Sequence, residues 1–223
     1  VFALSDKPSF DLISAPAITS VAQLRGKKIG ISAPGSLTEI IARQIFIANK
    51  IPLDQVTMLP LGTSDITWVA LKAGTIDATM LQIPQNFIAV DEGYRKIAAG
   101  ADVYRAVQGG LTTTKSVIND KPELVSKVIR ATQKALRLFR ADKKYATDFI
   151  RGPFLDMGKD RDKYAERVYE AALGYLSTTG TVDDKLQREM IATAAQRTKL
   201  AQPPPPERVF DFSFAQKVGE TIK

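Results

Sequence analysis

Alternating stretches of apolar and polar residues organise the chain, and the clearest stretch runs from residue 26 to residue 48. Lys28 to Ser32 begins charged and turns apolar, which is typical of a strand that enters a sheet. A Pro-Gly pair then breaks the chain, and Ser36 is suited to cap a helix with Glu39 completing a capping box. Apolar residues recur at helical spacing from there to Ala48. The pattern therefore predicts a buried strand, a turn and a helix.

The same unit repeats along the next fifty residues. Glycine or proline ends each element, so that strands alternate with helices through residue 99. We expect strands at 56–61, 76–81 and 95–99, and helices at 66–73 and 84–92. This β-α-β-α-β-α-β order is typical of an α/β fold with a mostly parallel sheet and helices on both faces.

The pattern differs on either side of this repeat. Residues 1–14 read as a strand, a turn and a second strand at 10–14, and a connector with a helical turn at 21–24 follows. Two extended segments are expected at 103–107 and 111–114. The rest is predicted to be a helical C-terminal region, with helices at 122–139, 141–150, 162–176, 183–199 and 214–222.

Composition excludes several classes of function. The 223 residues include no cysteine and no histidine, which removes thiolate chemistry, the usual general base and the usual zinc ligands. We therefore expect no catalytic residue, no metal and no cofactor. The net charge of +7 suggests anionic partners. Part of it forms a helical stripe that we interpret as a solvated face rather than a nucleic-acid surface, at Lys127, Arg130, Lys134 and Arg137.

A ligand site is expected where the first strand ends and the first helix begins. In open α/β sheets, ligands bind beyond the carboxyl ends of the strands. The first-turn amides of Leu37, Thr38 and Glu39 lack helical partners, and the helix dipole favours an anion there. Most corners of this kind bind nothing, so the alternative is that Ser36 only caps its helix.

The order of motifs resembles that of the periplasmic solute-binding proteins of ABC importers, in the branch for nitrate, sulfonate, taurine and thiamine precursors. The resemblance rests on LRGKKIGIS followed by PGS, on LPLGTSD, on ALKAGTIDATMLQIP and on the long helix from Pro122, and it covers nearly the whole chain. It implies a two-lobe fold of type II with the ligand in the cleft. Residues 1–20 and 106–223 would form lobe I and residues 21–105 lobe II, with hinges near 14–19 and 101–108. The family's first strands are missing from lobe I, so we expect an N-terminal portion outside this sequence.

The resemblance implies a set of ligand-binding residues at three strand-to-helix corners. They are Ser32, Gly35, Ser36, Leu37 and Thr38 at the first corner, Gly62, Thr63, Ser64 and Asp65 at the second, and Gln82 and Pro84 at the third. For the second corner the alternative is that its polar residues only cap their helix. We interpret Asp77 as a carboxylate that fixes a turn, and Trp68 as part of the core.

The resemblance further implies a function in import. The expected partners are a small-molecule solute and the transmembrane permease of the importer, with no nucleic acid, and the expected state is a monomer. The location would be the periplasm, or the extracellular face through a lipid anchor. Because Glu39 and Asp65 compete for the helix N-terminal field, we expect a solute larger or less charged than nitrate or sulfate, such as a carboxylated, aromatic or amine-bearing compound.

Two other functions share this fold. One is a cofactor-free lyase, which needs only carboxylates, whereas the related thiamine-pyrimidine synthases depend on a histidine and cysteines that these residues lack. The other is the ligand-sensing domain of a LysR-like regulator, which the helical C-terminal region with its four consecutive prolines fits poorly.

Overall fold

The computed structural model describes residues 1–154 and 159–222 and divides into two compact units. Unit 1 comprises Val1–Asp6 and Ala106–Lys223, and unit 2 comprises Lys7–Arg105. The resemblance implied that the first segment of lobe I ends at residue 20, but the structure assigns residues 7–20 to unit 2. The reason is that the strand at 10–14 pairs within the sheet of that unit. The chain crosses between units at 6–7, outside the expected hinge at 14–19, and at 105–106, inside the expected segment 101–108.

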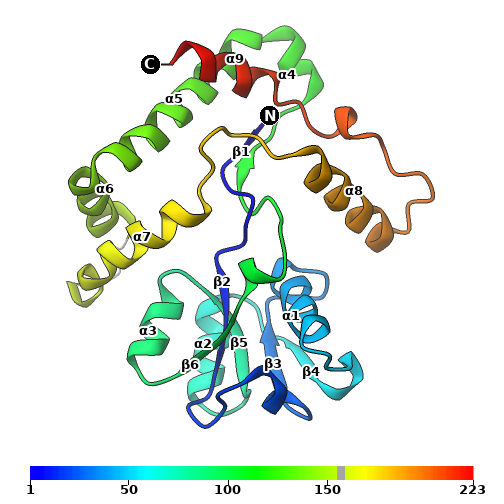
Figure 1. Cartoon of the computed structure of the whole chain (residues 1–223), viewed down its shortest axis with the longest axis vertical. Helices are drawn as coiled ribbons and strands as arrows, with labels where there is room; N and C mark the ends of the chain where they lie inside the picture. Colours follow the sequence, from blue (N-terminus) through cyan, green and yellow to red (C-terminus); the bar gives the residue numbers. More distant parts are fainter. Residues whose placement is uncertain (155–158, 223) are drawn as a thin grey trace. The chain divides into compact units, whose positions relative to one another are not determined.

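Unit 2 is built on one five-stranded sheet in the order β4-β3-β5-β2-β6 (blue to green in Figure 1). The strands are β2 (Phe10–Ser14), β3 (Lys28–Ile31), β4 (Thr57–Pro60), β5 (Ala78–Gln82) and β6 (Arg95–Ala99). The pairs β3–β4 and β3–β5 are parallel, as the alternating pattern predicted. However, β2 lies antiparallel between β5 and β6, so the sheet is mixed rather than mostly parallel. This strand precedes the β-α repeat and is joined to it by a connector instead of a crossover helix.

Helices cover both faces of this sheet, as predicted. They are α1 (Leu37–Ala48), α2 (Ser64–Lys72) and α3 (Gln85–Asp91). Successive residues of a strand point to opposite faces. Leu12 accordingly packs in a cluster with Ile41 and Phe46 of α1, whereas Ile13 packs in a second cluster with Trp68 and other residues of α2 and α3. These two apolar layers hold the strand ends and the helix starts in fixed positions.

Short helical turns link the main elements of unit 2. They are η1 (Val21–Leu24), which the sequence predicted, η2 (Leu53–Gln55) and η3 (Gly100–Asp102). The expected extended segment at 103–107 forms no strand. Of the segment expected at 111–114, only Leu111 lies in a strand, the two-residue β7 (Gly110–Leu111) of unit 1.

Unit 1 is mainly helical, as predicted. Its strands, β1 (Phe2–Ala3) and β7, pair antiparallel. Its helices are α4 (Lys115–Asp120), α5 (Pro122–Ala141), α6 (Lys143–Phe149), α7 (Ala165–Tyr175), α8 (Asp184–Thr198) and α9 (Ser213–Thr221), with shorter turns at η4 (Ile150–Phe154), η5 (Lys159–Tyr164) and η6 (Pro206–Arg208). Val125 and Ile129 of α5 form a buried cluster with Phe2 and with Ala215 and Val218 of α9.

The basic stripe on α5 is only partly a solvated face. Arg130 Nη1 lies 3.0 Å from Thr221 Oγ1, and Arg137 donates to the carbonyl oxygens of Gly219 and Ile222. These carbonyls end α9, where helical partners are lacking and the dipole favours a cation. Two residues of the stripe therefore hold the C-terminus of α9, which further weakens any reading as a nucleic-acid surface.

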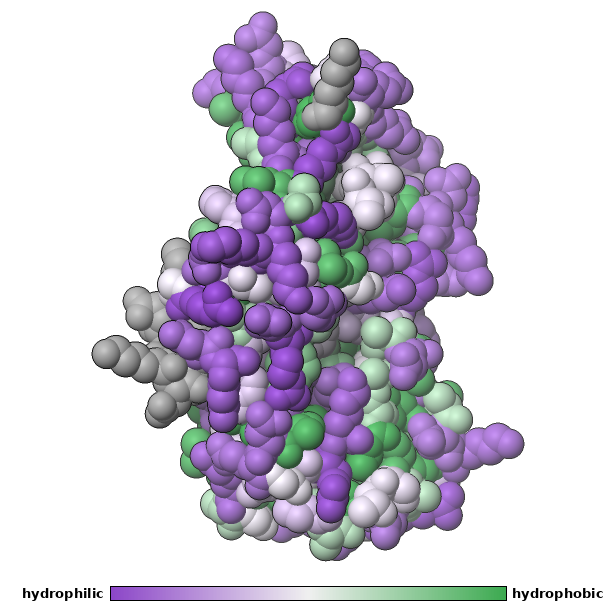
Figure 2. All heavy atoms as spheres, turned by 60° about the vertical axis from the view of Figure 1, so that its left-hand side comes forward, coloured by the Kyte–Doolittle hydropathy of each residue, from purple (hydrophilic) through white to green (hydrophobic). Residues whose placement is uncertain are grey.

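Hydrophilic side chains cover much of the face shown in Figure 2, with apolar residues exposed in patches between them. The exposed apolar residues of unit 2 include Ile47 on α1 and Ile66 and Val69 on α2. In the part of the chain that the structure describes, no helix has the length and hydropathy needed to cross a membrane.

Candidate functional site

The candidate site is the edge of the unit 2 sheet at which β3, β4 and β5 end. These three strands are neighbours and run in the same direction, so their carboxyl ends meet at one edge. The loop after each strand leads into a helix, namely α1, α2 and α3. The structure thus brings together the three corners that the sequence singled out as a ligand site.

A glycine turn and a serine cap shape the first corner. Gly35 has a φ of +74°, a conformation that residues with a side chain rarely adopt. Ser36 is the N-cap of α1, and its Oγ accepts the Glu39 amide at 3.4 Å. The carboxylate of Glu39 turns back as predicted, but it accepts the amide of Gly35 instead of that of Ser36. The Ser36 amide is already bonded to the carbonyl oxygen of Ala33 in the turn, which explains the shift by one residue.

Glu39 is also paired with a cation. Arg43, one turn further along α1, places Nε 2.9 Å and Nη2 2.7 Å from the same Glu39 oxygen. From the sequence, the negative charge of Glu39 was expected to compete with a ligand for the field at the helix N-terminus. Because Arg43 compensates that charge, Glu39 repels an anion at this corner less than expected.

Three hydroxyl groups cluster beside this helix start. Thr38 Oγ1 accepts the Ser32 amide at 2.9 Å, donates to Ser32 Oγ at 3.1 Å and lies 2.9 Å from Ser36 Oγ. Thr38 is buried, whereas Ser32 and Ser36 are partly exposed. Since Ser32 Oγ receives a hydrogen from Thr38, its own hydrogen remains to be donated elsewhere.

The first-turn amides of α1 are available as well. Within the described residues, the amides of Leu37 and Thr38 have no hydrogen-bond partner, as is usual at the start of a helix. Together with the Ser32 hydroxyl, they supply donors to one region at the positive end of the α1 dipole. This is the chemistry by which a protein holds an anionic group.

The second corner lies directly beside the first. Its Gly62 has a φ of +102°, and its amide donates to the Ser32 carbonyl oxygen at 3.0 Å. Thr63 is the N-cap of α2 by its backbone, but its side chain makes no capping bond, in contrast to the capping alternative. Ser64 and the exposed Asp65 form the first turn of the helix. The side-chain Nε2 of Gln85, the first residue of α3, donates to Asp65 Oδ1 at 3.1 Å.

The third corner contains residues that the sequence did not single out. Gln82 ends β5, and the buried Pro84 is the N-cap of α3. After them comes Asn86, whose Nδ2 lies 2.7 Å from Asp11 Oδ2 on β2. Lys96 on β6 lies 2.9 Å from the other oxygen of Asp11. The only hint in the sequence is the polar pair Gln85-Asn86 at the start of an apolar helix, and its link to Asp11 depends on the unpredicted antiparallel placement of β2.

Asp77 and Trp68 have the structural roles that the sequence predicted for them. Asp77 accepts the Lys28 amide at 2.9 Å and pairs with Lys27 at 3.6 Å, so it fixes the turn before β5. Trp68 is 7% exposed and meets the ring of Tyr94 edge-on at 4.7 Å, so it belongs to the core. Neither residue lies at the candidate site.

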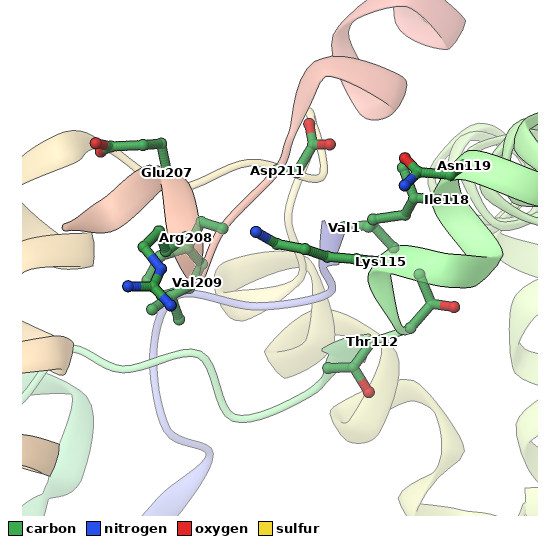
Figure 3. Close-up of a pocket in the computed structure, with 11 residues that line it drawn as sticks. Val1, Thr112, Lys115, Ile118, Asn119, Glu207, Arg208, Val209 and Asp211 are labelled. Atoms are coloured by element: carbon green, nitrogen blue, oxygen red, sulfur yellow. The ribbon is translucent and has the colours of Figure 1, made fainter. Parts of the chain in front are cut away.

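Cavities occur in both units. One of about 230 Å³ adjoins the first corner and is lined by Ile31, Pro34, Glu39, Arg43, Leu53, Val56, Met58 and Pro60. Another of about 430 Å³ lies in unit 1, where the amine of Lys115 extends toward Arg208 and Asp211 (Figure 3). None of the predicted site residues lines either cavity. No group of three or more potential metal ligands occurs among the described residues.

Comparison with known proteins supplies a family. The family model described as "NMT1/THI5 like" matches residues 1–146. No curated protein matches the chain.

Comparison with solved structures supplies the fold. The putative sulfonate-binding protein SsuA of Methylobacillus flagellatus KT is 16% identical over 99% of this chain and 68% of its own, with a TM-score of 0.74. The aliphatic sulphonate binding protein SsuA of Escherichia coli is 15% identical over 92% of this chain and 70% of its own, with a TM-score of 0.68. The desulfurization enzyme DSZB is 16% identical over 98% of this chain and 77% of its own, with a TM-score of 0.62. The fold is that of type II periplasmic binding proteins.

Proposed function

The chain belongs to the NMT1/THI5-like family, and from this premise we propose that it is the extracytoplasmic solute-binding component of an ABC-type import system. The observation that carries the proposal is the meeting of three strand-to-helix corners at one edge of the unit 2 sheet. Two of these corners present unpaired first-turn amides within the described residues, and a serine hydroxyl lies beside them. The similar solved structures include two periplasmic sulfonate-binding proteins, which supports the proposal of a solute-binding role.

The proposed solute is a small organic compound with an anionic group, either a sulfonate or a carboxylate. Its anionic oxygens accept hydrogen bonds from the amides of Leu37 and Thr38 and from the Ser32 hydroxyl. The α1 dipole adds to this attraction. Arg43 favours the binding of an anion there, because it neutralises the negative charge of Glu39 at the same helix start. Gly35 and Gly62 keep the backbone of both corners free of side chains that would block the solute.

The proposed role is capture rather than chemistry. The candidate site offers amides, hydroxyls and the carboxylate of Asp65, and these 223 residues include neither cysteine nor histidine. Such a site can hold and orient an anion but offers no thiolate or imidazole to attack it or to move its protons. Capture of the solute would select the conformation that the importer's permease recognises. The proposed location is the periplasm, or the extracellular face of the cell through a lipid anchor, with the protein acting as a monomer.

Thermal unfolding against a panel of solutes tests this proposal. The panel contains nitrate, alkanesulfonates, aromatic carboxylates, polyamines and pyrimidines. A ligand at 100 times its dissociation constant adds about 2.7 kcal/mol to the free energy of unfolding, which shifts the midpoint visibly. We expect a shift with sulfonates or carboxylates and none with polyamines.

A matched pair of variants shows whether the shift arises at the candidate site. Ser32→Ala removes the hydroxyl that faces the solute, and Thr57→Val changes an exposed hydroxyl at the opposite end of the same sheet. We expect Ser32→Ala to reduce the ligand-induced shift and Thr57→Val to leave it unchanged. If no member of the panel moves the midpoint of a cooperatively melting protein, the proposal is wrong.

A further inference from the structure

Asp11 is a buried carboxylate at the edge of the sheet where the candidate site lies. It belongs to β2, and its backbone pairs with Leu81, next to Gln82 of the third corner. Asp11 is 8% exposed, and each of its two oxygens has a partner. Asn86 Nδ2 lies 2.7 Å from Oδ2, and Lys96 Nζ lies 2.9 Å from Oδ1. Replacing a buried ion pair by apolar residues is often neutral or stabilising, so stability alone does not account for Asp11.

The contact with Asn86 is important because α3 is weakly held at its start. This helix has seven residues, and helices this short are not stable by themselves in water. Its N-cap is Pro84, whose side chain has no oxygen with which to cap the helix. The buried side chains of α3 are those of Asn86 and Ala89. One of the two side chains that anchor the helix is therefore polar, and it needs a polar partner.

Both ends of the Asn86 amide are engaged. Its Oδ1 accepts the backbone amide of Phe87 at 2.9 Å, which leaves the NH2 group to donate to Asp11. The bond to Asp11 is buried, so water does not compete for either partner. Since β2 is an interior strand of the sheet, Asp11 ties the first turn of α3 to the middle of unit 2.

We propose that Asp11 is a positioning residue of the candidate site, which acts through Asn86 to hold the third corner ready for the solute. This inference rests on the proposed function, in which that corner, with Gln82 and Pro84, is part of the solute-binding edge. A corner that is already ordered loses less conformational freedom when the solute binds, so the solute binds more tightly. Without the tie, part of the binding free energy is used to order the start of α3.

Three variants separate this role from a general contribution to stability. Asp11→Asn keeps an oxygen that can accept the NH2 group of Asn86, whereas Asp11→Val removes it. Asn86→Leu breaks the same bond from the other side and leaves Asp11 paired with Lys96, so it tests the tie even if Asp11→Val does not fold.

Hydrogen exchange of the unliganded protein measures the order of the third corner. The amides of Phe87 and Ile88 lie in the first turn of α3. We expect them to exchange about tenfold faster in Asp11→Val and in Asn86→Leu, as the loss of one buried hydrogen bond permits. In Asp11→Asn they should exchange at close to the wild-type rate.

Calorimetric titration measures the effect on the solute. The probes are propane-1-sulfonate and benzoate, one for each anionic group of the proposed solute. The affinity for the probe that wild type binds should fall about 3- to 30-fold in Asp11→Val and in Asn86→Leu, and should stay within about twofold in Asp11→Asn. Bound probe should slow exchange at Phe87 and Ile88 more in the two disrupted variants than in wild type, because there the solute has to order the corner.

Asp77→Val is the matched control, because Asp77 also accepts one amide and pairs with one lysine, but at the opposite edge of the same sheet. Its unfolding midpoint should fall, whereas its probe affinity and its exchange at α3 should match those of wild type. Equal affinity of wild type and Asn86→Leu overturns the positioning role alone, and so does an equal loss of affinity in Asp77→Val. Failure of wild type to bind either probe overturns the inference together with the proposed anion site.

Discussion

Arg43 and Glu39 lie one turn apart on α1, and the guanidinium contacts a single carboxylate oxygen of Glu39 through both Nε and Nη2. The other oxygen of Glu39 accepts the amide of Gly35 in the turn before the helix. Glu39 thus joins the turn to the helix while Arg43 compensates its charge. This pairing determines how attractive the α1 corner is to an anion.

The first prediction concerns this charge. Arg43→Gln leaves the Glu39 carboxylate uncompensated beside the proposed anion site, so affinity for an anionic solute should fall several-fold. The pair is partly exposed and its contribution to the free energy of unfolding should be about 1 kcal/mol or less. Titration of the variant with the best ligand of the panel measures the first effect, and denaturant unfolding the second.

A double variant provides the control. Because Arg43→Gln/Glu39→Gln removes both charges, it should recover most of the affinity that Arg43→Gln loses. If the single and double variants bind the solute equally, Arg43 does not act through Glu39.

The second prediction concerns Thr38, the centre of the hydroxyl cluster. Thr38→Val keeps the shape of this buried side chain but leaves the Ser32 amide without its acceptor. The free energy of unfolding should therefore fall by about 1–3 kcal/mol. Solute affinity should fall as well, because the Ser32 hydroxyl loses the hydrogen bond that orients it.

Ser36→Ala separates these two effects. It removes the cap of α1, which costs about 1 kcal/mol of stability, but it leaves the bonds between Thr38 and Ser32 intact. We expect Ser36→Ala to change affinity less than Thr38→Val does. The opposite order would show that the cap, and not the Thr38–Ser32 pair, prepares the site.

The sequence predicted the first corner closely because every part of it is local. Ser36 caps α1 where the pattern placed the cap, and Glu39 folds back within four residues. The sequence pattern did not predict that the Glu39 carboxylate accepts the backbone amide of Gly35 instead of that of Ser36. The reason is that the Ser36 amide is taken by Ala33, and the hydrogen bonds inside a turn leave no signature in residue spacing.

Contacts between distant residues could not be predicted in this way. Asp11 meets Asn86 across 75 positions, and Arg137 reaches the end of α9 across 85. Both contacts depend on how elements pack, and periodicity reports only which face of an element is apolar. The resemblance placed residues 1–20 in the other lobe, and residue spacing gave no signal that β2 pairs with β5 and β6.

The third prediction follows from the contact of Arg137 with α9. Arg137→Met removes donors from the carbonyl oxygens at the end of α9 while keeping the aliphatic part of the side chain. The last turn of α9 should open more often, so amide hydrogens near Gly219 should exchange faster. Lys134→Met is the control, because Lys134 is exposed on the same helix. Equal exchange in the two variants would mean that apolar packing alone holds α9.

The fourth prediction concerns Tyr175, which ends α7. Burial raises the pKa of its phenol above the usual value near 10, because the ionised form is poorly solvated inside the protein. The phenol of the unfolded chain therefore loses its proton at a lower pH than the phenol of the folded protein. In that range the folded state binds more protons, so the free energy of unfolding falls as the pH rises. The contribution of the neutral phenol to the free energy of unfolding is fully present below about pH 10 and is lost as the pH rises above it.

Denaturant unfolding between pH 8.5 and 11 measures this effect. Lysines also titrate in that range, so the informative quantity is the difference between wild type and Tyr175→Phe. The variant has no phenol to ionise, and its stability should decline less steeply above pH 10 than that of wild type. Tyr145→Phe, which changes an exposed tyrosine of the same unit, should leave the wild-type slope unchanged. Parallel curves for wild type and Tyr175→Phe would show that the phenol ionises as readily in the folded protein as in the unfolded chain.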